Sequence, residues 1–352
     1  MAELKSGKIQ TVLGLIDENQ LGTTLPHEHL FIELGLWFKE PSQATRKLMS
    51  EEKIRIDHPD ISWFKYHPYS NKDNLRLLNE KEAVYELMRF KAVGGNSIVD
   101  VTLDNIGRDP AALARVSRMT GINVVMGCGY YVGEIQVGDY DQKTVEDITA
   151  EIIHDIEVGV GIEQIKAGII GEIGCSWPLD KRERKSLIAS AHAQAATGSA
   201  ITVHPGRHAD SPLEIIDILK QAGADLEKVI ICHIDRTPFS LETRLKIAET
   251  GCSIEYDLFG WEGYYPLEMA IAHMPNDVQR IKEILEMKKN GYLNRVLISH
   301  DICYKTRRYA YGGHGYTHIL ENSVPVMKAW GLSDNDIDAL LIHNARRLIA
   351  LR

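Results

Sequence analysis

The sequence predicts a single α/β domain, spanning residues 1–352, that folds as a (β/α)8 TIM barrel. Two observations lead to this prediction: short runs of β-branched residues recur along the chain, and a longer stretch with helical periodicity follows most of them. Eight such runs suit a closed barrel better than a doubly wound sheet, which usually has fewer strands and a glycine-rich phosphate turn after the first. No such turn follows the first run here.

The predicted strands share an apolar, β-branched character and are bounded by turn residues. In chain order they are residues 25–32, 97–102, 123–131, 167–174, 200–206, 229–235, 253–260 and 296–301. The predicted helices are residues 79–93, 110–120, 145–158, 182–197, 212–222, 240–250, 277–289 and, last, 333–350. Residues 8–22 predict a small hairpin, with Gly14 and Gly22 at turns, that covers the bottom of the barrel. Residues 35–72 form an aromatic-rich insertion after the first strand, and a lid and an oligomer contact are equally good interpretations of it.

Composition argues against several classes of partner. The formal net charge of −9 disfavours nucleic acid or an anionic membrane, since binding to either needs a basic surface. No run of about eighteen apolar residues occurs, and the first ten residues lack the apolar core of a secretory signal. The 5 cysteines form no Cys-x-x-Cys pair and lie mostly in apolar stretches, which favours buried thiols in a reducing compartment. We therefore expect a cytoplasmic protein.

Metal-ligating side chains occur at the ends of several predicted strands. On a strand, the spacing of His27 and His29 points both rings the same way, as a pair of metal ligands requires. In a parallel barrel the carboxyl ends of all strands meet at one face, where the active site lies. The side chains expected at that face are His27, His29, Glu172, His204, His233 and Asp301.

This ligand set predicts a binuclear metal centre. Imidazoles and carboxylates without a cysteine suit Zn²⁺ first, with Mn²⁺, Co²⁺ and Fe²⁺ as alternatives. Six ligands are too many for one tetrahedral ion. They suit two divalent ions about 3.5–4 Å apart that share a bridging carboxylate and a bridging hydroxide. Such a hydroxide is a nucleophile at neutral pH, so the predicted chemistry is hydrolysis.

Several longer strings carry a resemblance to a known family. The chain resembles, over essentially its whole length, the phosphotriesterase family of the amidohydrolase superfamily, and it is most similar to the phosphotriesterase-related branch. The strings are Leu25-Pro26-His27-Glu28-His29-Leu30, Gly171-Glu172-Ile173-Gly174-Cys175-Ser176-Trp177-Pro178, His204-Pro205-Gly206-Arg207, Cys232-His233-Ile234-Asp235, Ile254-Glu255-Tyr256-Asp257-Leu258-Phe259-Gly260, Ser299-His300-Asp301 and Tyr311-Gly312-Gly313-His314-Gly315-Tyr316.

The resemblance implies a role for each ligand. His27, His29 and Asp301 would hold a buried ion, His204 and His233 an exposed ion, and Glu172 would bridge the two. Other members of the family place a carboxylated lysine at the bridging position, where this chain has Gly171. Glu172 follows one residue later, so we expect a local twist or bulge that the glycine permits. Lys166 lies at the wrong end of the fourth strand to replace that lysine.

The predicted mechanism assigns two further roles. Asp301 would take the proton of the attacking hydroxide and deliver it to the leaving group. By resemblance, Tyr131 lines the substrate pocket and can hydrogen-bond a scissile oxygen, whereas Tyr130 is equally well explained as packing.

Cations follow the strands that carry the ligands. They are Arg207, Arg236, Lys305, Arg307 and Arg308. A guanidinium binds carboxylate or sulfonate in a bidentate manner, so this cluster predicts a small anionic substrate, with Arg207 as the main anchor. For Arg236, pairing with Asp235 is the alternative, and for the strand-eight cations a place on a solvated loop.

Three functions follow from these observations. The first is a metal-dependent amidohydrolase for a small N-acyl amino or sulfonic acid, because the resembled branch is associated with deacylation of N-acetyltaurine. The second is a lactonase or carboxylic esterase with promiscuous phosphotriesterase activity, since a binuclear site supports each of these reactions. The third is an inert metal-binding barrel, which a complete ligand set disfavours. A homodimer is an open alternative to a monomer.

Overall fold

The chain forms a closed barrel of eight parallel strands, which confirms the predicted fold class. The computed structural model describes residues 6–42, 44–136, 138–237, 239–262 and 274–351. The barrel strands follow one another in the order of the sequence, each parallel to the next. They are β3 (Thr24–Glu28), β6 (Ser97–Asp100), β7 (Asn123–Cys128), β8 (Ile169–Gly174), β9 (Ile201–His204), β10 (Val229–Ile231), β11 (Ser253–Tyr256) and β12 (Val296–Ile298). Hydrogen bonds between His27 and the hydroxyl group of Ser299 join β3 to β12 and close the ring.

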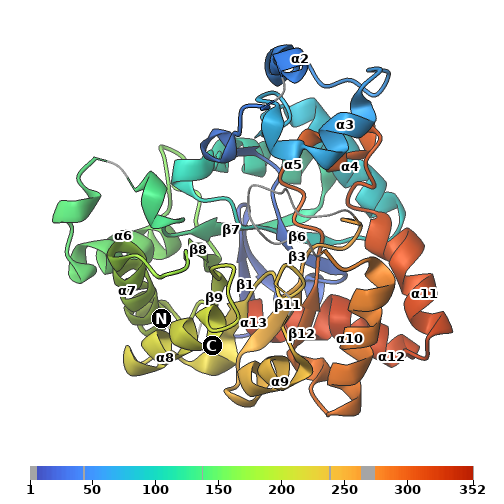
Figure 1. The fold of residues 1–352 in the computed structure, drawn as a ribbon. Coiled ribbons are helices and arrows are strands. Elements are labelled where there is room, and N and C mark those ends of the chain that lie inside the picture. The colour runs from blue at the N-terminus through green and yellow to red at the C-terminus, as the bar shows by residue number, and fades with distance from the viewer. Residues whose placement is uncertain (1–5, 43, 137, 238, 263–273, 352) are drawn as a thin grey trace.

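Helices surround the strands, as Figure 1 shows. Those that follow barrel strands are α5 (Pro110–Thr120), α6 (Val145–Glu157), α7 (Lys181–Thr197), α8 (Ser211–Gln221), α9 (Leu241–Glu249) and α10 (Asp277–Lys289), and α4 (Glu80–Ala92) precedes β6. The chain ends in α11 (Val324–Ala329), α12 (Asp334–Asp338) and α13 (Asn344–Ile349). A π-helical segment, Ala339–His343, lies between α12 and α13 in the region predicted as one helix. Helix α11 was not among the helices expected from the sequence.

The N-terminal segment covers the amino end of the barrel. Strands β1 (Lys8–Thr11) and β2 (Gly14–Asp17) form an antiparallel pair. Ile9 is fully buried among side chains inside the barrel, which include Val99, Val125 and Ile169. A backbone hydrogen bond of 3.0 Å from Gly7 to Leu351 joins the two ends of the chain. Because apolar side chains fill this half of the barrel, a polar site is confined to the carboxyl ends of the strands.

The first barrel strand is shorter than predicted. β3 ends at Glu28, and the predicted residues 29–32 leave the barrel to reach β4 (Ile32–Glu33), which pairs antiparallel with β5 (Arg76–Leu77). The Asp100 carboxylate accepts the backbone N–H of Leu30 at 2.7 Å, and the Glu28 carboxylate accepts that of Ile302 at 3.0 Å. These buried side-chain acceptors replace strand partners at this point, which hydrophobic periodicity could not reveal.

Short helices make up the insertion between the first two barrel strands. They are the α-helices α2 (Ala44–Lys47) and α3 (Ile61–Tyr66) and the 3-10 helices Gly35–Trp37, Leu48–Glu51 and Pro68–Ser70. Figure 1 shows α2 and α3 at the top of the view, outside the ring of strands. Trp37 and Tyr69 return from this segment to line the cavity at the strand ends. The insertion therefore forms part of the wall of that cavity.

Candidate metal centre

Two histidines and an aspartate form the first half of the site. His27 lies in β3 and His29 directly follows it, and both are buried. Asp301 follows β12 and its Oδ1 lies 3.2 Å from His29 Nε2 and 3.9 Å from His27 Nε2. The Nδ1 atom of His29 lies 2.8 Å from the hydroxyl oxygen of Thr102, which orients the ring.

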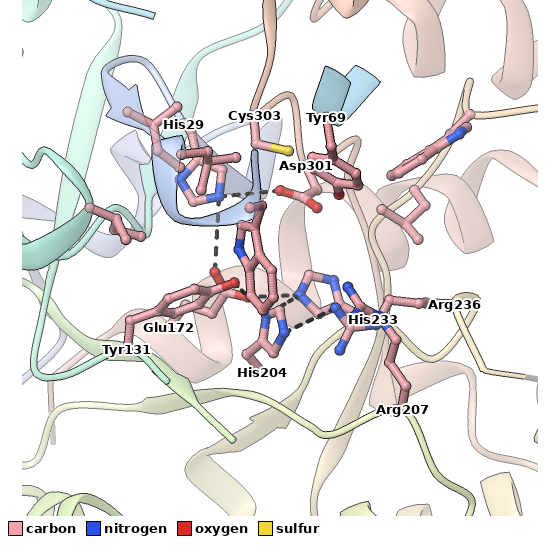
Figure 2. Close-up of a pocket in the computed structure, with 16 residues that line it drawn as sticks. His29, Tyr69, Tyr131, Glu172, His204, Arg207, His233, Arg236, Asp301 and Cys303 are labelled. Carbon is pink, nitrogen blue, oxygen red and sulfur yellow. Dashed lines mark hydrogen bonds and ion pairs between the residues drawn. The ribbon is translucent and has the colours of Figure 1, made fainter. Parts of the chain in front are cut away.

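Glu172 lies between two groups of candidate ligands. Its Oε2 faces His27 and His29, at 3.7 Å and 4.0 Å from their Nε2 atoms. Its Oε1 faces the other two histidines, 2.7 Å from His233 Nε2 and in contact with His204 Nδ1. Figure 2 shows His29, Glu172, His204, His233 and Asp301 turned toward one another. One carboxylate thus addresses two separate sets of donors, which is the arrangement of a bridging ligand.

A local irregularity of β8 brings Glu172 to this point. The register of β8 against β9 shifts between Ile170 and Ile173, and the peptide bond between Gly171 and Glu172 is cis. Gly171 has φ +117°, and a Cβ atom there would lie 2.1 Å from the carbonyl oxygen of Thr202. Only glycine fits this position. The bulge expected from the sequence is therefore present.

Two of the candidate ligand residues have an uncommon backbone conformation. His233 has φ 54° and Asp301 has φ 52°, and Gln164 is the third such non-glycine residue in the described part of the chain. Left-handed conformations cost free energy for residues with a Cβ atom and tend to occur at functional sites. This geometry turns both side chains into the mouth of the barrel, where the other ligands lie.

The electrostatics of the site favour a cation between its carboxylates. Burial disfavours a charged ring at His27, but Cys232, Glu172 and Asp257 outweigh burial and raise the pKa of His27 well above its usual value. Burial and the adjacent Arg236 lower the pKa of His204 to about 4, so this ring is neutral near pH 7. Burial opposes ionisation of Glu172, yet the histidines lower its pKa well below the usual value. His204 and Glu172 therefore have the protonation states that bind divalent metals, whereas an ion bound at His27 would displace the proton of that ring.

The donor set fits the two ions predicted from the sequence. Ligands at about 2.0–2.1 Å around a tetrahedral ion stand roughly 3.4 Å apart, and His27, His29 and Asp301 offer donor atoms that lie within 4.8 Å of one another. His27, Glu172 and His233 form a second group, which shares His27 with the first. The donors assigned to the outer ion also lie close together, since His204 Nδ1 is 3.0 Å from His233 Nε2 and both face Glu172 Oε1. His27 Nε2 is buried and has no hydrogen-bond partner among the described residues. A bound ion would satisfy this atom.

The remaining cavity walls combine cations with apolar groups. Arg207 and Arg236 line the cavity on the side of His233, away from His29 (Figure 2). Tyr131 is buried, its hydroxyl oxygen lies 3.2 Å from His204 Nδ1, and burial together with Glu172 raises its pKa well above the usual value, so the phenol stays protonated. The cavity has a volume of about 30 Å³. Its apolar lining consists of Ile32, Leu34, Trp37, Ile106, Leu258 and Trp261.

The cations that follow β12 do not reach this cavity, contrary to the expectation from sequence. Lys305 pairs with Asp73 at 2.9 Å. Arg307 donates to the carbonyl oxygens of Asp301 and Phe259, at 2.7 Å and 3.1 Å, so it supports the strand end. Arg308 is fully buried and donates to the carbonyl oxygen of Leu30 at 2.6 Å. The Asp73 carboxylate and these backbone carbonyl oxygens hold the three side chains away from the cavity.

The contacts of Tyr130 and Arg236 distinguish between the two interpretations given for each residue. Tyr130 hydrogen-bonds Glu151 and packs on Tyr140, outside the metal-site cavity, so the packing interpretation holds for it. Asp235 pairs with Arg280 at 2.6 Å, whereas a terminal nitrogen of Arg236 lies 3.0 Å from His204 Nε2. Arg236 therefore belongs to the site, and the alternative of an Arg236–Asp235 pair is wrong.

Sequence reasoning did not single out the acidic residues that support the ligands. Asp257 Oδ1 lies 2.7 Å from His233 Nδ1, and its Oδ2 accepts the backbone N–H of His233 at 2.8 Å. Glu255 Oε2 lies 3.3 Å from His27 Nδ1. A signal was present, because Glu255 and Asp257 interrupt residues 254–259, which are otherwise apolar.

No helix among the described residues has both the length and the apolar character that crossing a membrane requires.

The chain is similar to several known proteins in sequence and in structure. A family model described as the phosphotriesterase family matches residues 7–349. A Dictyostelium discoideum protein named N-acetyltaurine hydrolase is 44% identical, with 98% of each chain covered. A human protein of the same name is 42% identical, with 99% of each chain covered. The crystal structure of a resiniferatoxin-binding protein from Rhodobacter sphaeroides superposes with a TM-score of 0.93 at 34% identity, covering 97% of this chain and 95% of that one.

Proposed function

The chain belongs to the phosphotriesterase family of metal-dependent hydrolases, and from this premise we propose that it hydrolyses the amide bond of a small anionic N-acyl amino or sulfonic acid such as N-acetyltaurine. The observation that carries the proposal is the position of Glu172 between two sets of histidines, in a cavity that two arginines also line. The names of the full-length relatives support the substrate class.

The proposed ligands divide between two ions. His27, His29 and Asp301 would hold the inner ion, His204 and His233 the outer one, and Glu172 would contact both. When bound, two such ions supply a water-derived nucleophile at neutral pH and polarise the scissile oxygen. Zinc suits this nitrogen and oxygen set, and Mn²⁺, Co²⁺ or Fe²⁺ are the alternatives.

The walls of the cavity orient the substrate. Arg207 and Arg236 lie together at one side, where their guanidinium groups would bind the sulfonate or carboxylate. A short acyl group would pack against the apolar lining, of which Ile106 and Leu258 are part. Tyr131 would donate its phenolic hydrogen to the scissile oxygen.

Asp301 is the proposed proton carrier. Its side chain is 13% exposed, whereas that of His27 is 0% exposed, so Asp301 borders the space that a substrate enters. It would accept a proton as the nucleophile attacks and return that proton to the leaving amine. The hydrogen bond from Arg307 to the Asp301 carbonyl oxygen holds the strand end that carries this carboxylate.

The decisive experiment compares substrates. The kcat/KM of the Zn²⁺- or Mn²⁺-loaded enzyme is measured for N-acetyltaurine and several N-acyl amino acids, beside a neutral lactone and a neutral phosphotriester. Hydrogen bonds to charged groups contribute about 1.5–3 kcal/mol each, so the anionic amides should be preferred by about a hundredfold or more. A preference for the lactone would instead support the second candidate. The apolar lining of the cavity favours that candidate, because it would accept a neutral ring.

Replacement of Arg207 tests its proposed role as the anchor for the anionic group of the substrate. Arg207→Ala is expected to raise KM for N-acetyltaurine by about 10- to 100-fold, which corresponds to the loss of one charge-assisted hydrogen bond. The KM for a neutral ester should stay unchanged. Arg184→Ala is the matched control, because Arg184 lies on the outer surface and pairs with Glu214. Equal changes of KM for the anionic and the neutral substrate would contradict the role of Arg207 as an anion anchor.

Two wider expectations belong to the same proposal. All five cysteines are buried and unpaired by disulfides, which supports a reducing compartment such as the cytoplasm.

The aromatic insertion also contributes exposed apolar side chains, among them Leu48 and Ile56. These side chains would suit a homodimer contact. Size-exclusion chromatography with light scattering tests this expectation by measuring the oligomeric state.

A further inference from the structure

A second layer of buried acids lies beneath the proposed inner ion. Glu255 and Asp257 extend from β11 and its end into the barrel, and both side chains are fully buried. Glu255 Oε2 lies 3.3 Å from His27 Nδ1, and Asp257 Oδ2 lies 3.5 Å from the same nitrogen. The thiol of Cys232 donates to Glu255 Oε2 at 3.3 Å. His27, Cys232, Glu255 and Asp257 therefore form one buried cluster.

The two nitrogens of His27 have different surroundings. Nδ1 faces the acids of this second layer, whereas Nε2 faces Glu172 and Asp301. In a neutral imidazole one nitrogen carries the hydrogen and the other has the free lone pair. A hydrogen bond from Nδ1–H to a carboxylate therefore leaves the Nε2 lone pair for a metal ion, and it makes that lone pair more basic.

Of the two acids, Glu255 is the one available for His27. Asp257 already accepts from the ring and the backbone N–H of His233, at 2.7 Å and 2.8 Å. Glu255 Oε2 accepts otherwise only from the thiol of Cys232, which is a weak donor, and Glu255 Oε1 is buried without a hydrogen-bond partner among the described residues. A buried carboxylate with an unsatisfied oxygen costs free energy unless nearby positive charge compensates it. Two divalent ions above His27 would supply that charge.

We infer that Glu255 is a positioning residue for the inner metal ion: it holds His27 with the hydrogen on Nδ1 and Nε2 aimed at the ion, and its negative charge offsets that of the metal centre. The inference rests on the proposed function, since it presupposes a metal at His27. Glu255 itself touches neither substrate nor reacting atoms. Its contribution is to metal affinity and to the geometry of one ligand.

The test measures metal binding rather than turnover. Metal-free full-length protein is titrated with Zn²⁺ in competition with a chelating indicator, for the wild type and for Glu255→Gln. Outer partners of metal ligands typically contribute about 10- to 100-fold in affinity, so one of the two ions should bind more weakly in the variant by that factor. The visible absorption spectrum of the Co²⁺-loaded variant should also change, because the ligand field at His27 changes.

Matched variants separate this role from a general loss of stability. Glu86→Gln removes the charge of another buried glutamate, one on α4 that accepts the backbone N–H of Ala310, and should leave both Zn²⁺ affinities unchanged. If circular dichroism shows that Glu255→Gln is unfolded, the Zn²⁺ affinities of Glu255→Asp and Glu255→Ala are compared instead. Glu255→Asp keeps the carboxylate and should therefore retain more affinity for the ion than Glu255→Ala.

The possible results separate the role of Glu255 from the existence of the metal centre itself. Wild-type protein that binds two ions, together with a Glu255→Gln variant of equal affinities and identical Co²⁺ spectrum, would overturn the positioning role and leave the metal centre intact. Wild-type protein that binds no ion would overturn the metal centre, and the role of Glu255 with it.

Discussion

The Glu172→Ala variant is expected to bind at most one divalent ion per chain and to lose nearly all hydrolytic activity. Glu172 offers Oε2 to His27 and His29 and Oε1 to His204 and His233, so its removal takes a ligand from both sets at once. A Lewis-acid metal contributes several kcal/mol, and about 1.4 kcal/mol corresponds to a tenfold change in rate. The kcat/KM should therefore fall by about a thousandfold or more, and metal analysis after gel filtration gives the ion count.

Lys166→Ala is the natural control for this variant. Lys166 precedes β8 and lines a cavity at the opposite end of the barrel with Gln10 and Val12, so neither metal content nor activity should change. Two ions retained in Glu172→Ala would contradict the bridging role. A loss of both ions in Lys166→Ala would point instead to a carboxylated lysine as the bridge.

The Asp301→Asn variant is expected to keep its fold and lose most of kcat. The amide oxygen can still face His29, where Oδ1 now lies 3.2 Å from Nε2, but the group can no longer carry a proton. General acid–base groups contribute about 10²- to 10⁴-fold to rate, and kcat should fall within that range. The KM for an anionic amide should change little, because Arg207 and Arg236 are untouched.

Metal analysis of the same preparation separates the two roles of Asp301. If the variant holds two ions and kcat falls by the expected factor, the loss belongs to proton transfer. If kcat stays within about threefold of the wild-type value with both ions bound, Asp301 is a ligand alone, and another group carries the proton. Asp210→Asn serves as the control, because the Asp210 side chain is 74% exposed and lies outside the cavity.

The barrel and the candidate ligands were accessible to sequence reasoning for one physical reason. Strand and helix periodicities are local properties, and parallel strands all present their carboxyl ends at the same face. A histidine or carboxylate that ends a predicted strand can therefore be assigned to that face without knowledge of the packing. His204 at the end of β9 and Glu172 in β8 illustrate this, and the resemblance to a known family added the division between two ions.

Features that depend on contacts between distant segments were less accessible. The first strand ends early because Asp100 and Glu28 accept backbone N–H groups outside the ladder. Arg307 and Arg308 turn inward because backbone carbonyl oxygens of Asp301, Phe259 and Leu30 accept their hydrogens. In both cases a charged side chain forms a hydrogen bond with a backbone group at a strand end or in a loop, and no periodicity encodes that choice.

Local patterns in the chain suffice to predict the alternation of strands and helices, the end of the barrel at which the candidate site lies, and the types of side chain placed there. Folding was needed to show which cations share the cavity, how the irregular β8 aims Glu172 at both sets of donors, and that Glu255 and Asp257 contact His27 and His233. The difference lies in the distance along the chain over which each feature arises. Chain periodicity is local, whereas burial, charge pairing and ligand geometry arise between segments that meet only when the barrel closes.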